Sequence, residues 1–390
     1  MQLPPTRDEN LRQFATDKQW EILEAIWQHG SIPRAMPHLK MDKALAYRQR
    51  DAVLRRAVKQ GYAPELHHHH IVPDGYKLRG TSTLYDGDGT PRLQWVKTTE
   101  DSERQAEFLR EMVATLSEDI PRLKPVRGPK AVNDDLLAVY PIGDHHLGMY
   151  AWAEEAGEDY DLAIAETLLE RAMQSLVATS EPCGQALVAV LGDFFHYDGL
   201  DPVTPTSKNL LDSDGRFAKM VRVGIRLIRR VIDLALSRHA KVRVIIEAGN
   251  HDLSSMVFMA ECMAALYERD ERVSVDTVPN HFHYHHFGST LIGVHHGHGA
   301  KLEQLPLIMA ADQPEAWGQS QHRYWYTGHT HKDRVLDIQG VRVESFRVLP
   351  PKDAWAAGKG YRSARSMTAI TIHKKFGEAD RRFVKPEMFA

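Results

Sequence analysis

The chain is predicted to be an α/β protein, in which a small helical module precedes one larger domain. Three observations predict this. Its 390 residues exceed the roughly 100–200 residues of one domain. Short apolar runs alternate with helical stretches after residue 135, and a basic helical pattern occupies the first 65 residues. With 43% hydrophobic and 26% charged residues, the composition is that of an ordinary globular protein.

Composition excludes several classes of protein. A net charge of −3 excludes a uniformly basic nucleic-acid binder, so any such contact must come from a local patch. Cys183 and Cys262 are too few for a disulfide framework or a thiolate metal cluster. Because no long apolar run is present, we expect a cytoplasmic protein without a membrane partner. The 22 histidines prompt a search for metal ligands, although any single one is usually a solvated imidazole.

Residues 1–65 are expected to form a helix-turn-helix-like module that binds DNA. Trp20, Leu23, Ile26 and Trp27 recur at helical spacing, and Gly30 follows as a helix stop. A second short helix and a turn near residues 39–41 then precede a long third helix.

The third helix of this module is predicted to be basic. Between residues 34 and 59, eight Lys or Arg stand against two acids, which is typical of a phosphate-backbone contact. The candidate DNA-binding residues are Lys43, Arg48, Arg50, Arg55, Arg56 and Lys59. The alternative is a solvated helical face. Pro33 and Pro37 depart from the helix-turn-helix pattern, because proline removes a donor and clashes with the preceding turn.

Residues 66–120 are expected to be a connector, made of a β-hairpin and a helix. Alternating β-formers surround the turn signal DGDG at residues 86–89, and a helix is expected from about residue 100 to 117. The four histidines at 67–70 have no spaced partners, so they are assigned no role. Prolines and mixed charges predict a linker over 121–134, and the large domain then covers 135–390.

The large domain alternates strand-like and helical segments. Apolar runs at 136–142, 186–191, 241–248, 289–294 and 324–327 predict strands, and helices are expected near 161–178, 216–238 and 255–269. This alternation predicts an α/β sheet that is covered on both faces.

Polar residues follow each of these five strands. The motifs are GDHH, GDFFHYD, GNHD, HHGH and GHTH. Turn formers alone explain any one of them, but hardly all five. Asp144, Asp193, Asn250, His296 and His329 are separated by 49, 57, 46 and 33 residues, which leaves room for a crossover and another strand each time. Because ligands gather at the carboxyl ends of strands in open α/β sheets, we expect these side chains to converge.

In order and spacing, the motifs resemble the calcineurin-like metallophosphoesterases, whose pattern is D-x-H, GD, GNH[DE], H before G, and GHxH. The resemblance covers about residues 135–373. It implies a four-layer α/β/β/α sandwich. We expect the runs at 341–349 and 367–375 to contribute to its second sheet.

The resemblance also implies a site for two divalent cations. One would be held by Asp144, His146 and His331, the other by Asn250, His296 and His329, with Asp193 bridging them. Carboxylate, amide and imidazole donors without thiolate suit Mn²⁺, Fe or Zn²⁺; we expect Mn²⁺, with Mg²⁺ as a further candidate. Two such ions about 3.5–4 Å apart would give a hydroxide that attacks phosphorus in line.

His251 is the candidate for proton transfer, because the resemblance places it beside the leaving oxygen. Asp252 is expected to orient it. The alternative is that His251 only holds Asn250 in place. His145 and His295 could exchange with the assigned ligands, but strand alternation points them to the opposite face.

Three further residues are candidates for substrate binding: His298, Arg362 and Arg365. Arginine binds phosphate bidentately, although a solvated loop is the alternative for both arginines. Residues 204–217 either shape a substrate lip or cap the following helix through Ser213 or Asp214; the cap is favoured.

Within the family, the motifs at residues 144–148 and 192–198 look most like the DNA-repair exonuclease branch. The whole chain resembles phosphoesterases of phages and prophages, for which the location would be the host cytoplasm. We therefore expect an exo- or endonuclease that acts on DNA, with RNA as a second candidate substrate and a homo-oligomer as a candidate assembly. The alternatives are a phosphodiesterase or phosphatase for a small ester such as a cyclic nucleotide, and a DNA-binding protein without activity, which the intact ligand set disfavours.

Overall fold

The computed structural model describes residues 7–39, 41–59, 62, 76–85, 91–100, 126–205 and 209–389. Of residues 58, 59, 76–85 and 91–100 it describes the backbone alone. The chain divides into two compact units, Met1–Leu109 and Arg110–Ala390. Residues 101–117 of the predicted helix, the histidines at 67–70 and residues 121–125 of the predicted linker lie outside the described residues.

In its described residues, the first unit contains three α-helices behind a short 3₁₀ helix. These are η1 (Glu9–Phe14), α1 (Asp17–His29), α2 (Ile32–Leu39) and α3 (Lys43–Lys59). Thr16 and Gln19 form a capping box at the start of α1, and Gly30 ends the helix with φ at 75°. The apolar stripe of α1 is buried against α2 and α3 in one small core.

The two prolines do not prevent α2 from forming. Pro33 lies in the first turn, where its missing N–H would have no partner within the helix. Pro37 lies inside the helix and forgoes one hydrogen bond. The hairpin is also present, as the antiparallel pair β1 (Tyr76–Tyr85) and β2 (Pro91–Glu100).

The second unit has a six-stranded sheet in the order β13-β12-β3-β4-β5-β6. Its four central and edge strands β3 (Asn133–Ile142), β4 (Cys183–Leu191), β5 (Lys241–Glu247) and β6 (Val273–Val275) run parallel. They are joined by α6 (Leu162–Thr179), α7 (Phe217–Arg238) and α8 (Leu253–Tyr267), with the short α5 (Ala153–Ala156) before α6. β12 (Met367–His373) and β13 (Gly377–Val384) add antiparallel strands beside β3.

A five-stranded sheet in the order β10-β11-β9-β8-β7 packs against the first sheet. Its strands are β7 (His283–Phe287), β8 (Thr290–Val294), β9 (His322–Thr327), β10 (Arg334–Ile338) and β11 (Val341–Ser345). β8, β9 and β11 are parallel, whereas β7 and β10 are antiparallel edges. The other helices among the described residues are η3 (Leu302–Gln304), α9 (Leu305–Asp312), α10 (Pro314–Gln319), α11 (Ala354–Gly358) and η4 (Pro386–Phe389).

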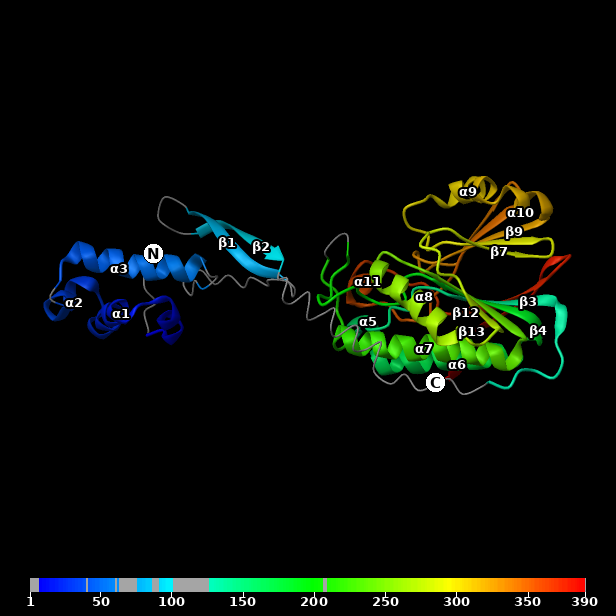
Figure 1. Cartoon of the computed structure of the whole chain (residues 1–390), viewed down its shortest axis with the longest axis horizontal. Helices are drawn as coiled ribbons and strands as arrows, with labels where there is room; N and C mark the ends of the chain where they lie inside the picture. The colour runs from blue at the N-terminus through cyan, green and yellow to red at the C-terminus, as the bar shows by residue number, and fades with distance from the viewer. Residues whose placement is uncertain are drawn as a thin grey trace. The chain divides into compact units, whose positions relative to one another are not determined.

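These elements form four layers, which confirms the predicted α/β/β/α fold class. α6 and α7 lie below the six-stranded sheet, and α9 and α10 lie above the five-stranded sheet (Figure 1). Apolar side chains from the facing surfaces of both sheets fill the layer between them, including Val139, Leu187, Ile292 and Tyr326. In the described part of the chain, no helix combines the length and the apolar character needed to cross a bilayer.

Two expectations about the sheets are wrong. We expected one sheet with helices on both faces, but the strands at 289–294 and 324–327 belong to the second sheet. One face of the first sheet is therefore covered by helices, and its other face is covered by the second sheet. The run at 367–375 was expected in the second sheet, but β12 pairs with β3, with Ile370 opposite Val139. The physical reason is that β3 has an open edge whose backbone N–H and C=O groups need partners, and periodicity does not reveal that need.

Candidate metal centre

The five polar motifs meet at one end of the sandwich. Three follow β3, β4 and β5 of the first sheet, and two follow β8 and β9 of the second. Because all five strands end at the same side of the layered core, residues almost 190 positions apart become neighbours: the His329 N–H donates to both oxygens of Asp144, at 3.0 and 2.8 Å. The seven predicted ligands are brought together in this way.

The first group of donors consists of Asp144, His146 and His331, whose ligand atoms all lie within 4.8 Å of one another. His331 Nε2 is 3.2 Å from Asp144 Oδ1 and 3.3 Å from His146 Nε2. Asp144 and His146 are buried, and no distance in this group exceeds what a single bound cation would span. The donors therefore fit one divalent cation.

The second group consists of Asp193, His296 and His329, again within 4.8 Å. His296 Nε2 lies 3.3 Å from Asp193 Oδ2 and 3.2 Å from Asn250 Oδ1, which brings the amide into the same group. His296 Nδ1 donates to the Leu191 carbonyl at 2.7 Å, so its Nε2 is left to face the other donors. These carboxylate, amide and imidazole donors fit a second divalent cation.

The charges in the centre are unbalanced without a cation. Burial disfavours a charged His296, but the Asp193 carboxylate outweighs it and raises the pKa of His296 to about 10. Burial lowers the pKa of His146 well below its usual value, and the neighbouring His251 and His331 add to that effect. Imidazole nitrogens only 3.3 Å apart repel unless a proton or a cation lies between them. The donor set thus fits divalent cations.

The backbone carries strain at the ligands. Of the six non-glycine residues with positive φ in the described ranges, five are predicted ligands: Asp144 (40°), His146 (46°), Asp193 (49°), His329 (67°) and His331 (53°). The sixth is Gln339, in the tight turn between β10 and β11. Each such residue costs on the order of 1 kcal/mol or more. The surrounding fold therefore holds these ligands in place at an energetic cost, as functional sites commonly do.

Two glycines in the motifs are required by close approach. A Cβ at Gly249 would lie 2.0 Å from Asp193 Oδ1, and one at Gly328 would lie 2.4 Å from Asp144 Oδ2. Each glycine directly precedes a predicted ligand of its own loop and contacts a predicted ligand of a neighbouring loop. Because glycine has no side chain, the two loops can approach this closely. This explains why GN and GH, rather than N and H alone, stand at these strand ends.

Asp252 does not have the expected position beside the His251 ring. Its two oxygens accept main-chain N–H groups of three residues: Asp193 at 3.2 Å, Gly249 at 2.8 Å and Phe195 at 2.9 Å. Burial, reinforced by the Asp193 carboxylate, raises its pKa well above the usual value. Asp252 therefore fixes the loops after β4 and β5 to each other, which sequence spacing did not reveal.

His251 lies at the edge of the centre. Its Nδ1 donates to the His196 carbonyl at 2.7 Å, and its main-chain N–H donates to Asp193 Oδ1 at 2.8 Å. The ring centroid is 4.9 Å from that of His146. Since Nδ1 is occupied, Nε2 is the nitrogen available for proton transfer.

His196 is a site residue that the sequence reading missed. It is buried, its Nδ1 is 3.3 Å from His146 Nδ1, and its ring stacks on His251. Its Nε2 is buried without a hydrogen-bond partner among the described residues. Its position in the GDFFHYD motif, three residues after Asp193, was the available signal. In the same motif Asp198 accepts the N–H groups of Ser254 and Ser255 and so caps α8.

The two ambiguous histidines point away from the centre. The His145 ring contacts Phe194, with centroids 5.4 Å apart, and burial lowers its pKa to about 3. His295 stacks on Phe282 and donates from Nδ1 to the His281 carbonyl. His298, a predicted substrate contact, lies between these regions: its ring centroid is 5.1 Å from that of His296 and 6.3 Å from that of His295.

The donors open into a cavity of about 1030 Å³. Arg362 and Arg365 both line it, yet each donates to protein atoms. Arg365 pairs with Glu158 and donates to the Leu349 carbonyl, and Arg362 donates to the Tyr361 and Ala357 carbonyls. The two arginines thus stabilise the wall of the cavity, and the sequence did not indicate that Arg365 pairs with Glu158.

The expected helix cap in the segment 204–217 is also different. Asp214 accepts the N–H of Leu162, the first residue of α6, rather than capping α7. The residues Asn209, Leu210, Leu211 and Asp212 line the cavity, so the segment does shape a lip. A loop can cap any helix start that lies nearby in space, which explains why the neighbour in sequence was the wrong choice.

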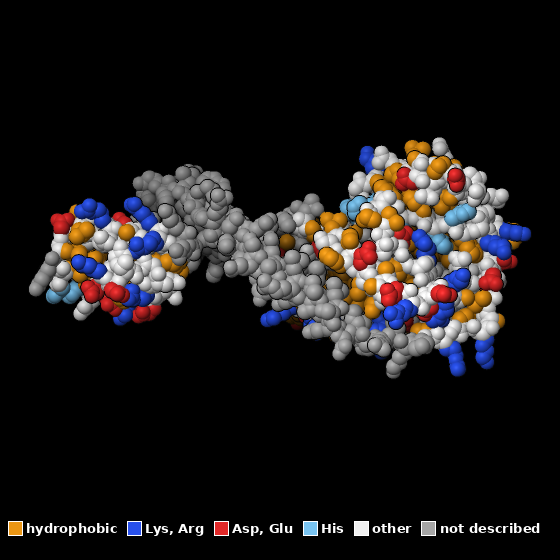
Figure 2. Space-filling view, in the orientation of Figure 1, with side chains coloured by type: hydrophobic (Ala, Val, Ile, Leu, Met, Phe, Trp, Pro, Cys, Tyr) orange, Lys and Arg blue, Asp and Glu red, His pale blue; other side chains and the backbone are white. Residues whose placement is uncertain are grey.

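The predicted DNA-binding residues all lie on α3. Arg56 donates to the Phe14 carbonyl and to Gln19, and Arg50 pairs with Asp51, so these two stabilise the unit itself. Lys43, Arg48 and Arg55 are exposed, and of Lys59 only the backbone is described. On the face shown in Figure 2, acidic and basic side chains alternate over this unit.

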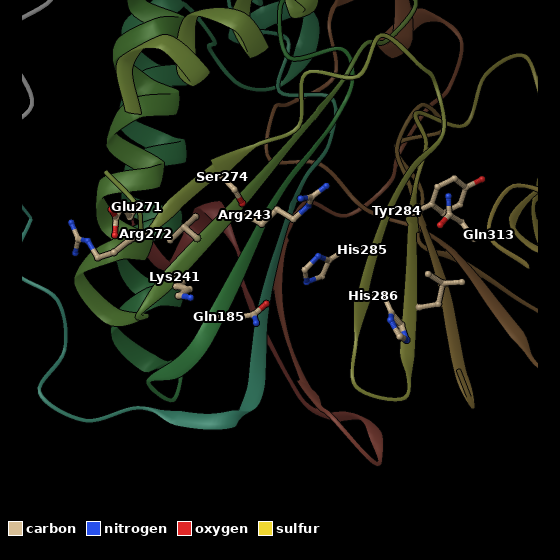
Figure 3. A pocket seen from close by; sticks show the side chains of 12 residues that line it. Gln185, Lys241, Arg243, Glu271, Arg272, Ser274, Tyr284, His285, His286 and Gln313 are labelled. Atoms are coloured by element: carbon tan, nitrogen blue, oxygen red, sulfur yellow. The ribbon is translucent and has the colours of Figure 1, made fainter. Parts of the chain in front are cut away.

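A second cavity, of about 590 Å³, lies at the edge of the sandwich between β5 and β7. Arg243 and His285 point into the space between the sheets there (Figure 3). Arg243 pairs with Asp276 and Arg272 pairs with Asp270, so two of its cations are already neutralised. We assign this cavity no role.

Comparisons with known proteins found solved structures of low similarity to this chain. No family model and no curated protein matches the chain. Similar solved structures include a conserved protein of Streptococcus pneumoniae, described as a predicted phosphoesterase, at 12% identity over 65% of this chain and 91% of that one, with a TM-score of 0.30. An archaeal phosphodiesterase is 13% identical over 64% and 98% of the two chains, with a TM-score of 0.33. A dimetal phosphatase from Danio rerio is 8% identical over 64% and 98%, with a TM-score of 0.34. Because these likenesses are distant, the function must be inferred from the geometry of the site.

Proposed function

We propose that the chain is a metal-dependent phosphodiester hydrolase and that its substrate is DNA. The observation that carries the proposal is the convergence of seven donors from five loops into two adjacent groups at the floor of one open cavity. Two adjacent cation sites of this kind are the usual device for hydrolysing phosphate esters.

The residues of the site have two proposed roles, which are metal binding and proton transfer. Asp144, His146 and His331 would hold one cation, and Asn250, His296 and His329 the other, with Asp193 between them. Two bound divalent cations supply a water of lowered pKa and neutralise charge on the phosphate oxygens. We expect Mn²⁺ to give the highest activity, because the donors are a mixture of nitrogen and oxygen atoms and contain no thiolate.

His251 donates the proton that the leaving oxygen needs. Its Nδ1–H is held by the His196 carbonyl, which fixes the ring so that Nε2 faces the cavity. A positioned imidazolium contributes about 10²–10⁴-fold to such a step. His251→Ala should therefore lose rate by that order while the protein keeps its metal.

Two features support DNA as the substrate. The cavity, at about 1030 Å³, is at the upper end for small-ligand sites and is open to solvent, so part of a strand can enter it. Lys43, Arg48 and Arg55 on α3 supply exposed positive charge in the first unit. Joining such a unit to the hydrolase would raise the local concentration of DNA at the site.

The test is a time course in Mn²⁺ with end-labelled duplex, single-stranded and nicked circular DNA, and with a small phosphodiester alongside. Asp193→Ala removes the central ligand, and Asp337→Ala, an exposed carboxylate on β10, is the matched control. We expect DNA breakdown that Asp193→Ala abolishes and Asp337→Ala retains. Intact DNA together with turnover of the small ester would contradict DNA as the substrate, and no turnover at all would contradict the hydrolase.

A small phosphodiester is the second candidate substrate. It is favoured by the pairing of Arg365 with Glu158, which leaves one fewer free cation along the cavity for a long phosphate backbone. The same assay separates the two candidates by the relative kcat/KM for DNA and for a cyclic nucleotide.

The DNA contact of the first unit has its own test. We expect the triple change Lys43→Ala, Arg48→Ala and Arg55→Ala to weaken DNA binding and to reduce the slope of log K against log salt by up to about three. Glu21→Ala, at an exposed position on α1, leaves the basic set intact and is the control. An unchanged salt slope in the triple variant would contradict a DNA-binding role for α3.

A further inference from the structure

Two large aromatic side chains are exposed on the wall of the cavity that contains the metal donors. Trp355 is 64% exposed and Tyr361 is 42% exposed. Their rings stack with centroids 5.9 Å apart and an interplanar angle of 24°. Both line the same cavity as His146, Asn250 and His331. Exposed apolar surface of this size beside a candidate active site commonly marks a binding surface.

The backbone holds this pair in place before any ligand arrives. Trp355 lies on α11, whose first turn is capped by Asp353, which accepts the Ala356 N–H at 2.7 Å. The Tyr361 N–H donates to the Ala356 carbonyl at 3.0 Å. Gly360, with φ at 83°, makes the turn that returns the chain to that position. Because the turn is closed by its own hydrogen bonds, little ordering remains to be done when a ligand binds.

A cation from the metal-donor loop completes the surface. Lys332 Nζ lies 5.4 Å from the centre of the Tyr361 ring. Lys332 directly follows the ligand residue His331, so one short loop reaches both the donors and the aromatic pair. The Arg362 guanidinium is bonded to the carbonyls beside the pair and adds a second positive charge. An anion attached to a flat ring is the ligand that matches these charges and this surface.

We infer that Trp355 and Tyr361 form a stacking platform for an unpaired nucleobase next to the phosphodiester that is hydrolysed. The inference rests on the proposed function and narrows its substrate to a single-stranded segment or a frayed strand end. Every base has an aromatic face that can stack on such a pair, whereas in a duplex both faces are covered by neighbouring bases. The platform therefore favours unpaired strands without requiring a particular sequence.

The first test measures binding, independently of hydrolysis. Wild-type protein in chelator is titrated with a labelled single-stranded oligodeoxythymidylate and with the same strand carrying abasic residues. We expect the intact strand to bind about tenfold or more tightly than the abasic strand. Trp355→Ala and Tyr361→Ala should remove that difference, and Trp355→Phe should restore most of it.

The matched control is Phe383→Ala. Phe383 on β13 is 59% exposed, and Lys385 Nζ lies 5.9 Å from the centre of its ring. It is therefore a similar pair of an exposed aromatic ring and a cation, but it does not line the cavity. This variant should discriminate between intact and abasic strands as the wild type does. Equal binding of both strands by the wild type, or unchanged discrimination in Trp355→Ala, would overturn the platform.

The second test measures kcat/KM in Mn²⁺ for intact DNA, abasic DNA and a cyclic nucleotide. We expect Trp355→Ala to reduce kcat/KM for intact single-stranded DNA about tenfold and to leave abasic DNA within about twofold. Hydrolysis of intact and abasic DNA at equal rates would overturn the platform alone, because hydrolysis itself would remain. Hydrolysis of none of the three would overturn the proposed function. An effect confined to the cyclic nucleotide would overturn the strand as the ligand.

Discussion

The Asp252 carboxylate accepts the main-chain N–H of Asp193 at 3.2 Å, so the residue expected to orient His251 instead fixes a predicted metal ligand. The same carboxylate accepts the N–H groups of Phe195 and Gly249. One buried side chain therefore joins the loops that follow β4 and β5, whose residues Asp193 and Asn250 are 57 positions apart in the sequence.

Asp252→Asn should destabilise the protein. An amide has one oxygen, so its NH₂ group must face at least one of the three N–H donors, which costs about 1–3 kcal/mol for each unsatisfied buried group. Urea unfolding followed by circular dichroism measures this loss. The exposed Asp337→Asn is the control and should unfold as the wild type does. Equal stability of Asp252→Asn and the wild type would contradict the structural role of Asp252.

Gly249→Ala should disrupt the metal centre without removing a ligand. The added Cβ would lie 2.0 Å from Asp193 Oδ1 and 2.3 Å from the Asp193 main-chain nitrogen, so one of the two loops must move. We expect metal content, measured by mass spectrometry of the desalted protein, to fall by half or more. Gly318→Ala, where a Cβ meets nothing within 4 Å, should retain its metal.

His196→Ala should impair hydrolysis while metal content stays at two ions per chain. His196 lines the cavity, and its ring stacks on that of His251, the proposed proton donor, so the His196 ring helps to orient His251. We expect kcat/KM to fall about 10–100-fold, as when a residue that orients a catalytic group is removed. Metal analysis beside the kinetics decides the point, because loss of an ion would make His196 a ligand.

Metal binding should stabilise the second unit by relieving repulsion between its donors. Ligand at about 100 times its Kd adds about 2.7 kcal/mol for one site. For a unit of this size that corresponds to a rise in Tm of about 5 °C for each site. Calorimetry with and without Mn²⁺ measures the shift, and Asp193→Ala should show little of it. A Tm that does not respond to any divalent cation would contradict the metal centre.

Stability should depend on pH through a buried cluster beside β5 and β7. His283 lies 3.1 Å from Glu247 and 3.6 Å from Asp276, and Arg243, His281 and His295 also face this cluster. Burial opposes a charged His283, but Asp276 and Glu247 outweigh it and raise its pKa to about 9. The stability due to His283 is therefore fully present below its ordinary pKa of 6.5 and is lost as the pH rises through about 9.

Glu247 works in the opposite direction. Burial would raise its pKa, but hydrogen bonds from His281, His283 and His295 lower it from 4.5 to about 2, so its contribution is lost as the pH falls through about 2. In thermal unfolding, His283→Gln should cost most near about pH 6 and progressively less towards about pH 9.5. His286→Gln, exposed on the same strand, is the control. A cost that does not change with pH would contradict the charged state of His283.

Much of the centre was predictable because its signals are local. A glycine and a polar residue directly after an apolar run mark a strand end, and the order of five such ends along the chain does not depend on knowing which strands are neighbours. Asp144, Asp193 and His296 could therefore be found by reading along the sequence. The helices α6, α7 and α8 were predictable for a similar reason, since each carries its own periodic apolar stripe.

The sequence by itself determined the alternation of strands and helices and the polar motifs at strand ends, and the resemblance carried by those motifs implied the fold class and the seven donors. Only the tertiary structure decided that β12 pairs with β3, that Asp252 bonds to the backbone of Asp193, that Asp214 caps α6, and that Trp355 and Tyr361 share a cavity with the donors. The physical reason is that periodicity and turn chemistry act between neighbours in the chain. Hydrogen-bond partners, by contrast, are chosen among all groups that packing brings within about 3 Å, and that choice exists only after the layers have assembled.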